Sequence, residues 1–203
     1  MASRVLFAKG GRTLLKVYWG SMFAQKSMAL FREVLRARAA SKKVQCFKYD
    51  DGRYSKSEIV THDGLAVQAV PVPNTLALLA AVEPDTEVII IDEAQFFDDR
   101  LVEAANDWAN QGKTVIAAGL DMDRYGRPFG IMPALAATAE EAIKLRAICM
   151  CCGDEAWISF GRGTTTSETK EVGGAEKYEA RCRKCARAGR RLAATTDVPS
   201  FKK

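Results

Sequence analysis

Apolar residues gather in short runs along this chain, and amphipathic segments separate the runs. Runs of four to seven residues that are rich in branched or aromatic side chains predict β-strands at residues 14–19, 43–49, 66–70, 88–91 and 114–120. Segments with apolar positions three and four apart predict helices at residues 29–40, 75–82, 100–110, 133–138 and 139–145. Because strands and helices alternate, the pattern predicts an α/β fold, a parallel sheet with helices on both faces.

The run from Val88 to Ile91 consists of four β-branched residues, which predicts a strand buried on both faces of the sheet. Asp92 and Glu93 follow at the carboxyl edge, where open α/β sheets bind ligands. The two carboxylates fit the acidic partners of a phosphate site, in which Asp92 would hold a metal ion and Glu93 would accept a proton. A strand end capped by solvated acids is the alternative interpretation.

The segment between the first predicted strand and the first helix has the pattern of a phosphate-binding loop, G-x-x-x-x-G-K-[ST], with one departure. Lys26 would reach the β- and γ-phosphates and the Ser27 hydroxyl would hold Mg²⁺, while backbone N–H groups at the helix N-terminus complete the anion site. The loop residues are Gly20, Ser21, Met22, Phe23, Ala24, Gln25, Lys26 and Ser27. An ordinary strand-to-helix turn that contains Gly and Lys is the alternative.

The departure is Gln25, which stands where the pattern has its second glycine. Glycine in such a loop supplies a positive φ and lets the backbone approach the phosphate closely. If the loop keeps that geometry, a non-glycine residue costs about 1–2 kcal/mol, and its side chain must point away from the nucleotide. Gln25 therefore either weakens nucleotide binding or is tolerated by the loop.

Composition narrows the class of protein. The chain has 203 residues, of which 48% are hydrophobic and 27% are charged, as in a soluble globular protein. No run approaches the ~18 apolar residues of a membrane span, so we expect no membrane association. The net charge is +5, and much of it follows Arg181. Without interleaved aromatic residues, this basic tail is expected to be solvated and not to bind nucleic acid.

Two Cys-x-x-Cys pairs, Cys149/Cys152 and Cys182/Cys185, lie about 30 residues apart. This spacing predicts a tetrahedral zinc site of four cysteines, and we expect no disulfides because no signal peptide is expected. A closed four-thiolate site leaves no position for a substrate, so we assign it no catalysis. The Gly/Thr/Ser-rich stretch between the pairs would be a loop that reaches toward the nucleotide site, or else a surface hairpin without a ligand.

Together these residues resemble the zinc-containing, P-loop thymidine kinases over about residues 13–187. The order and spacing of the matching residues carry the resemblance: the phosphate loop, Lys48-Tyr49 with Asp51-x-Arg53-Tyr54, Thr61-His62-Asp63, Ile91 to Phe97, Gly119-Leu120-Asp121 with Pro128-Phe129-Gly130, the cysteine pairs, and Gly173-Gly174-x-x-Lys177-Tyr178.

The resemblance implies ATP-dependent phosphorylation of the 5′-hydroxyl of thymidine, and also of deoxyuridine, in pyrimidine deoxynucleotide salvage. It implies a cytoplasmic homotetramer with a zinc-held lasso loop that closes over the base. Glu93 matches the general base, Lys26, Ser27 and Asp92 match the phosphate and Mg²⁺ groups, and Asp51 and Arg53 match residues near the phosphates. The positions that line the nucleoside pocket are Met22, Phe96, Leu120, Phe129, Ser159 and Tyr178.

The chain also departs from the family pattern in the loop after residue 120. Arg124-Tyr125 stands where relatives usually have Phe then Arg, so the pocket aromatic is either lost or supplied by Tyr125. The chemical groups of Lys26, Ser27, Asp92 and Glu93 are intact, so we expect an active kinase, whose activity Gln25 would reduce if it weakens nucleotide binding. A catalytically impaired relative that serves as a nucleoside-binding or assembly subunit is the alternative.

We divide the chain into four segments. They are a flexible N-terminal segment (1–12), a P-loop kinase domain (13–146), a zinc-binding lasso domain (147–192) and a flexible tail (193–203). A zinc-ribbon protein that binds nucleic acid through the basic tail would leave Asp92, Glu93 and the phosphate loop without a role.

Overall fold

A six-stranded sheet forms the centre of the protein in the computed structural model, which describes residues 14–50, 57–61, 63–161 and 177–196. Neighbouring strands all pair in parallel, in the order β5-β2-β6-β7-β1-β8. The strands are β1 (Leu14–Gly20), β2 (Val44–Tyr49), β5 (Val70–Val72), β6 (Val88–Asp92), β7 (Thr114–Leu120) and β8 (Glu141–Leu145). The predicted α/β fold with a parallel sheet is confirmed.

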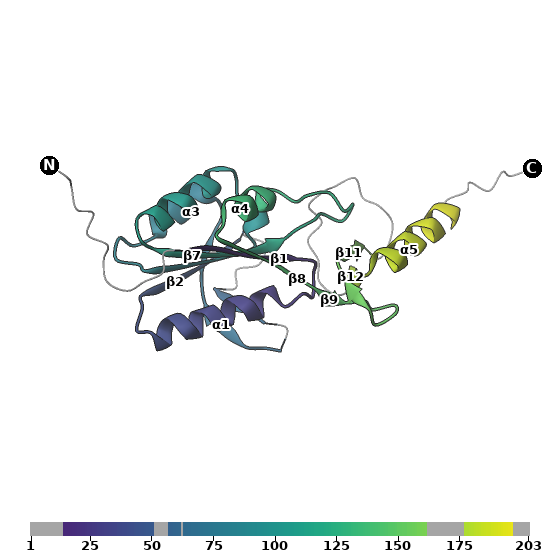
Figure 1. Ribbon diagram of the computed structural model, residues 1–203, viewed down its shortest axis with the longest axis horizontal. Coiled ribbons are helices and arrows are strands. Elements are labelled where there is room, and N and C mark those ends of the chain that lie inside the picture. Colours follow the sequence, from purple (N-terminus) through teal and green to yellow (C-terminus); the bar gives the residue numbers. More distant parts are fainter. Residues whose placement is uncertain (1–13, 51–56, 62, 162–176, 197–203) are drawn as a thin grey trace, which may run out of the picture.

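Helices cover both faces of this sheet, as Figure 1 shows. On one face lies α1 (Lys26–Ala39), and on the other lie α3 (Arg100–Asn110) and α4 (Met132–Thr138). Beside α3 packs α2 (Thr75–Ala81), which begins where the Asn74 side chain accepts a hydrogen bond from the Ala77 N–H at 2.9 Å. This arrangement leaves the carboxyl edge of the strands for the loops that carry the site.

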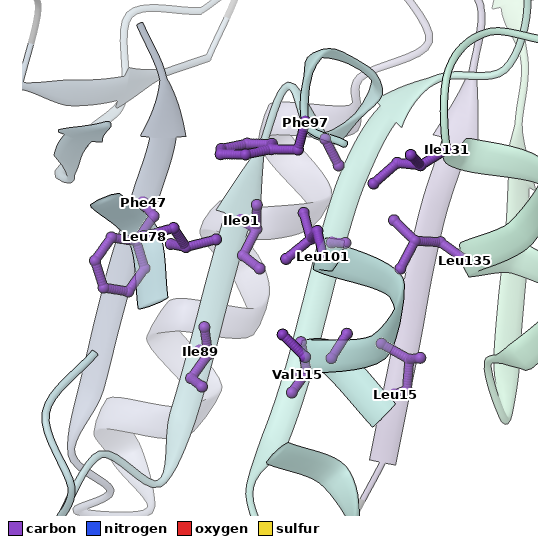
Figure 2. Close-up of a cluster of buried hydrophobic side chains, with 14 of the residues drawn as sticks. Leu15, Phe47, Leu78, Ile89, Ile91, Phe97, Leu101, Val115, Ile131 and Leu135 are labelled. Atoms are coloured by element: carbon purple, nitrogen blue, oxygen red, sulfur yellow. The ribbon is translucent and has the colours of Figure 1, made fainter. Parts of the chain in front are cut away.

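The larger apolar core lies between the sheet and the layer of α3 and α4, where alternate strand residues meet helix side chains (Figure 2). Its fully buried members include Leu15, Ile89, Ile91, Val115, Leu101 and Leu135. On the opposite face, Leu30 and Val34 of α1 pack with Ile90 of β6. Since every residue of β6 is buried, the strand is fixed from both sides and holds the residues at its carboxyl end in place.

One predicted helix is wrong. Residues 139–145 were expected to be helical, but Glu141–Leu145 forms β8, which pairs with β1 in register from Lys16 opposite Glu141. The segment has good helix formers, yet its side chains alternate in burial, and the open edge of β1 overrides local propensity. The buried ammonium of Lys16 lies 3.1 Å from Glu33 of α1, and it gains a second partner on β8, where Glu141 lies 2.9 Å away.

The C-terminal part contains two short antiparallel pairs and a helix, which lie together at one end of the molecule in Figure 1. β9 (Ala147–Ile148) pairs with β10 (Glu155–Ala156), and β11 (Ile158–Gly161) pairs with β12 (Tyr178–Arg181). The final helix, α5 (Arg183–Thr196), was not predicted and crosses the boundary set at residue 193.

The strand predicted at residues 66–70 is divided between β4 (Ala66–Gln68), which pairs antiparallel with β3 (Glu58–Val60), and β5 of the main sheet. Among the described residues, no helix combines the length and the apolar character that crossing a membrane requires.

Candidate active site

The phosphate-binding loop occupies the turn from β1 to α1. A side chain at Gly20 would collide with the backbone oxygen of Leu145 on β8, so this position requires glycine. Gln25 has φ 58° and ψ 33°, the left-handed conformation expected of the missing glycine, and its side chain is exposed. The loop therefore holds its turn without glycine at residue 25, and the glutamine side chain lies in solvent.

Lys26 begins α1, and its ammonium group folds back over the loop. The Nζ atom donates to the backbone oxygen of Ser21 at 2.8 Å and to that of Gly20 at 3.3 Å. Burial lowers the pKa of Lys26, while the negative charges of Glu93, Asp92 and Asp121 act against this shift. These interactions bring the lysine and three carboxylates into one electrostatic cluster at the carboxyl edge of the sheet.

The hydroxyl of Ser21 is a further sign that the loop suits an anion. The Ser21 side chain is buried, and its Oγ has no hydrogen-bond partner among the described residues. A buried hydroxyl of this kind is costly unless a ligand supplies the partner. A phosphate oxygen seated in the loop would accept this hydrogen bond, so the residues present fit a bound phosphate.

Asp92 ends β6 and is 5% exposed. Its Oδ1 accepts a hydrogen bond from the Glu93 N–H at 2.9 Å. Burial, together with the negative charge of Glu93, raises the pKa of Asp92 to about 7. A divalent cation would stabilise a buried carboxylate that has a second carboxylate beside it, so Asp92 fits the Mg²⁺ of a nucleotide. Ser27 is the second residue of α1 and remains the predicted second ligand.

Glu93 has φ 58°, the left-handed conformation, directly after the buried strand. Gln95 holds the Glu93 carboxylate, and the sequence alone assigned Gln95 no role. The Gln95 amide donates from Nε2 to the Glu93 carboxylate at 2.5 Å, and its Oε1 accepts from the Leu120 N–H at 3.0 Å. The available signal was a polar residue between the apolar Ala94 and Phe96.

Asp121 is a second residue whose role the sequence did not reveal. It follows β7, is 3% exposed, and its Oδ2 lies 2.8 Å from the Nζ of Lys144 on β8. This contact is an ion pair without hydrogen-bond geometry, since neither carboxylate oxygen accepts a hydrogen bond from a described residue. Lys144 also lies over the Trp19 ring, 5.2 Å from its centroid, so the pair joins β7 and β8 across the end of β1.

The residues predicted to line a nucleoside pocket fall into two groups. In the first, the Met22 N–H of the phosphate loop donates to the Ser159 Oγ on β11 at 2.9 Å, and Ser159 is buried. In the second, the Phe96 ring meets the Phe129 ring edge to face at 5.6 Å and the Tyr49 ring at 5.2 Å. Flat apolar rings and a few polar groups suit a planar base.

The other predicted pocket residues lie on β7, β12 and the long loop. Leu120 ends β7, and Tyr178 begins β12 with its side chain buried. Tyr125 lies in the loop after β7 with 36% of its surface exposed, and the guanidinium carbons of Arg124 and Arg127 are 5.8 Å and 5.6 Å from its ring centroid. Asp51, Arg53 and the Gly/Thr/Ser-rich stretch at residues 162–176 lie outside the described residues.

The four predicted zinc ligands come together. The sulfur atoms of Cys149, Cys152, Cys182 and Cys185 all lie within 4.8 Å of one another. The Cys152 and Cys182 sulfurs are 3.8 Å apart, which is the edge of a tetrahedron with Zn–S bonds of ~2.3 Å. Burial disfavours the Cys149 thiolate, but N–H groups of Cys182, Cys151 and Cys152 lower its pKa to about 6. The cluster could bind a zinc ion.

This cysteine cluster packs against the phosphate loop. Ala24 of the loop is buried with Ala147, Cys149, Ala156 and Ala180, and the Phe23 side chain packs against the same group. The contact joins the small C-terminal strands to the turn that begins α1. A metal that holds the cysteines together would therefore also support the phosphate loop from outside.

A parallel sheet with a lysine-bearing loop after its first strand, and two acids at the end of a neighbouring strand, defines the P-loop phosphotransferases. Within this class, the model of the thymidine kinase family matches residues 13–186. The chain therefore belongs to the thymidine kinase family, as its resemblance predicted, and its membership indicates a nucleoside kinase.

Proposed function

We propose that this chain transfers the γ-phosphate of ATP to the 5′-hydroxyl of thymidine, and of deoxyuridine, in pyrimidine deoxynucleotide salvage. The observation that carries the proposal is the cluster of Lys26 with Asp92 and Glu93 at one edge of the sheet, in a chain of this family. Phosphoryl transfer needs positioning and charge neutralisation more than covalent chemistry, and this cluster supplies both.

Glu93 is the proposed proton acceptor. As the 5′-oxygen of the nucleoside forms its bond to the γ-phosphorus, the bond from that phosphorus to the β–γ bridging oxygen breaks, and ADP leaves with the electron pair. The hydroxyl proton passes to the Glu93 carboxylate, so charge does not build up on the attacking oxygen. General-base assistance of this kind contributes about 10²–10⁴-fold to a rate.

The remaining charges belong to the phosphates. Lys26 would exchange the carbonyl oxygens of Gly20 and Ser21 for phosphate oxygens, since one ammonium serves either set of acceptors. Asp92 and Ser27 would hold Mg²⁺, which neutralises charge on the β- and γ-phosphates when bound. Asp51 and Arg53 remain predicted phosphate neighbours from the family resemblance.

The nucleoside would bind between the phosphate loop and the C-terminal strands. The Phe96 and Phe129 rings offer flat apolar surface, and Ser159 joins β11 to the loop through Met22. Tyr125 is proposed as a further ring at the pocket because the chain has no Phe at the preceding position. By the same resemblance, we propose a cytoplasmic homotetramer with a zinc-held loop over the base.

A catalytically impaired relative that binds nucleosides is the second candidate, and Gln25 is the observation that favours it. Its left-handed backbone is a conformation that costs a non-glycine residue about 1–2 kcal/mol. The retained turn weighs against impairment, and so does the exposed side chain of Gln25, which lies in solvent. We therefore favour the active kinase.

The proposal is tested by incubating the purified chain with Mg-ATP and a panel of thymidine, deoxyuridine, deoxycytidine and deoxyguanosine, with product mapping by mass spectrometry and phosphorus NMR. We expect the 5′-monophosphates of thymidine and deoxyuridine, and no product from the other two nucleosides. Transfer to a purine or to a cytosine nucleoside alone would contradict the proposed substrate and leave the phosphotransferase class in place. Binding of thymidine without any transfer would favour the impaired relative.

A further inference from the structure

We propose that Gln95 is a positioning residue that fixes Glu93 for phosphoryl transfer and links it to β7, the strand that borders the proposed nucleoside site. The inference rests on the proposed function, because it concerns the same transfer. Gln95 lies in η1 (Ala94–Phe96), the short turn that follows Glu93, and its side chain is 2% exposed.

Both ends of the Gln95 amide are used. Nε2 donates to the Glu93 carboxylate at 2.5 Å, and Oε1 accepts from the Leu120 N–H at 3.0 Å. Glu93 follows β6 and Leu120 ends β7, so a single buried amide joins two neighbouring strands at their carboxyl edge. Rotating the amide would turn its oxygen toward a carboxylate and its NH₂ toward an N–H, which would leave both bonds unmade.

The surroundings of Gln95 leave room for this side chain and little else. A side chain at Gly119 would lie 2.6 Å from the Gln95 Oε1 and 2.6 Å from the Met132 sulfur. A side chain at Gly130 would collide with the Gln95 backbone oxygen. Since real Cβ atoms do not approach so closely, the glutamine occupies a slot that two glycines keep open.

The consequence concerns the direction in which the Glu93 carboxylate points. Glu93 leaves β6 in a left-handed conformation and is half-buried, so its backbone alone does not hold the carboxylate. The Gln95 amide holds one carboxylate oxygen and leaves the remaining acceptor sites for a substrate hydroxyl. Misplacement of a reacting group by about 1 Å can cost 100-fold in rate. We therefore expect kcat to fall when the hydrogen bond from Gln95 to Glu93 is removed.

Two variants separate the bonds of Gln95. Gln95→Met removes both bonds, whereas Gln95→Glu keeps an oxygen for the Leu120 N–H and removes the donor to Glu93. The control is Gln45→Met near the amino end of β2, because the Gln45 amide is also used at both ends and accepts a further hydrogen bond from the Thr86 hydroxyl at 2.5 Å. Its amide donates to the Ala81 oxygen at 3.2 Å and accepts from the Glu83 N–H at 2.8 Å.

The experiment measures kcat, the KM for ATP, and the melting temperature for each variant. We expect both Gln95 variants to lower kcat by about 10- to 100-fold with the KM for ATP changed less than about twofold. Gln45→Met should lower the melting temperature about as much as Gln95→Met and leave kcat within about twofold of wild type. A Gln95→Glu variant with wild-type kcat, or a Gln45→Met variant with the same loss of kcat, would overturn the proposal.

A double variant tests whether Gln95 acts through Glu93. In a Glu93→Gln background, adding Gln95→Met should lower the residual kcat by less than about threefold, because the group that Gln95 positions is already gone. A further loss as large as that in the wild-type background would overturn the role. If thymidine is not phosphorylated, the comparison is made with the nucleoside that is, or with ATP hydrolysis. Failure on thymidine then contradicts the substrate, and unaffected turnover in Gln95→Met contradicts this inference.

Discussion

Replacing Gln25 with glycine tests whether the phosphate loop is already shaped for a nucleotide. Gln25 has φ 58° and its side chain makes no capping hydrogen bond to α1, so glycine removes strain without removing a cap. The left-handed conformation costs a non-glycine residue about 1–2 kcal/mol. The greater freedom of glycine in the unfolded chain returns about 0.5–1 kcal/mol of this. The net gain in unfolding free energy is therefore about 0–1.5 kcal/mol, with a central value of about 0.75 kcal/mol.

For a chain of 203 residues, the central value corresponds to a rise in melting temperature of about 1.5–3 °C. The matched control is Ser41→Gly, because Ser41 has φ 56°, is exposed, and lies in the turn after α1, away from the site. Calorimetry gives the melting temperature of each variant, and titration calorimetry gives the Kd of Mg-ADP. We expect both variants to be more stable, and the Kd of each to stay within about twofold of wild type.

The reasoning fails if Gln25→Gly binds Mg-ADP about tenfold or more tightly than wild type while Ser41→Gly does not. That result would mean that the loop with glutamine does not present its backbone N–H groups to a phosphate. A Gln25→Gly variant that is less stable than wild type would also refute it, because glycine relieves the left-handed strain only if that strain exists.

Three further predictions concern metal, pocket and pH. Metal analysis should find about one zinc per chain, retained by Cys151→Ser and lost from Cys152→Ser, as expected if only the latter is a ligand. Ser159→Ala should raise the KM for thymidine by about 2- to 12-fold, because it removes the hydrogen bond that the Met22 N–H donates to Ser159. An unchanged KM would mean that β11 does not contribute to the nucleoside site. Because the pKa of Asp92 is raised to about 7, stability should fall as pH rises from about 4 to 7, and Asp92→Asn without Mg²⁺ should melt above wild type at pH 8.

The central strands could be predicted because their sequences leave little choice. The β-branched run from Val88 to Ile91 is typical of a buried parallel strand, and the acids after it then fall on the ligand-binding edge. The same logic failed for residues 141–145, whose Ala, Glu, Lys and Leu suit a helix. Only the free edge of β1 and the charge of Lys16 make this segment a strand, and neither is local information.

Within the site, the sequence predicted the residue types but not how they are held. The cysteine spacing was enough to predict the four-sulfur cluster, because two close pairs can meet in a tetrahedron. The hydrogen bond from Gln95 to Glu93 depends on the left-handed φ of Glu93 and on the space beside Gly119 and Gly130. A sequence pattern reveals neither feature. The ion pair of Asp121 and Lys144 joins β7 and β8, which lie on opposite sides of β1. It could not be predicted without knowing the order of the strands in the sheet.

The most direct test of the proposed chemistry is the rate of thymidine 5′-monophosphate formation from Mg-ATP by wild type, Glu93→Gln and the control Glu103→Gln, an exposed acid on α3. We predict turnover by wild type and control, and a loss of about 10²–10⁴-fold in Glu93→Gln with thymidine binding retained. Equal rates for wild type and Glu93→Gln would contradict the role of Glu93, and no transfer by any of the three would contradict the kinase itself.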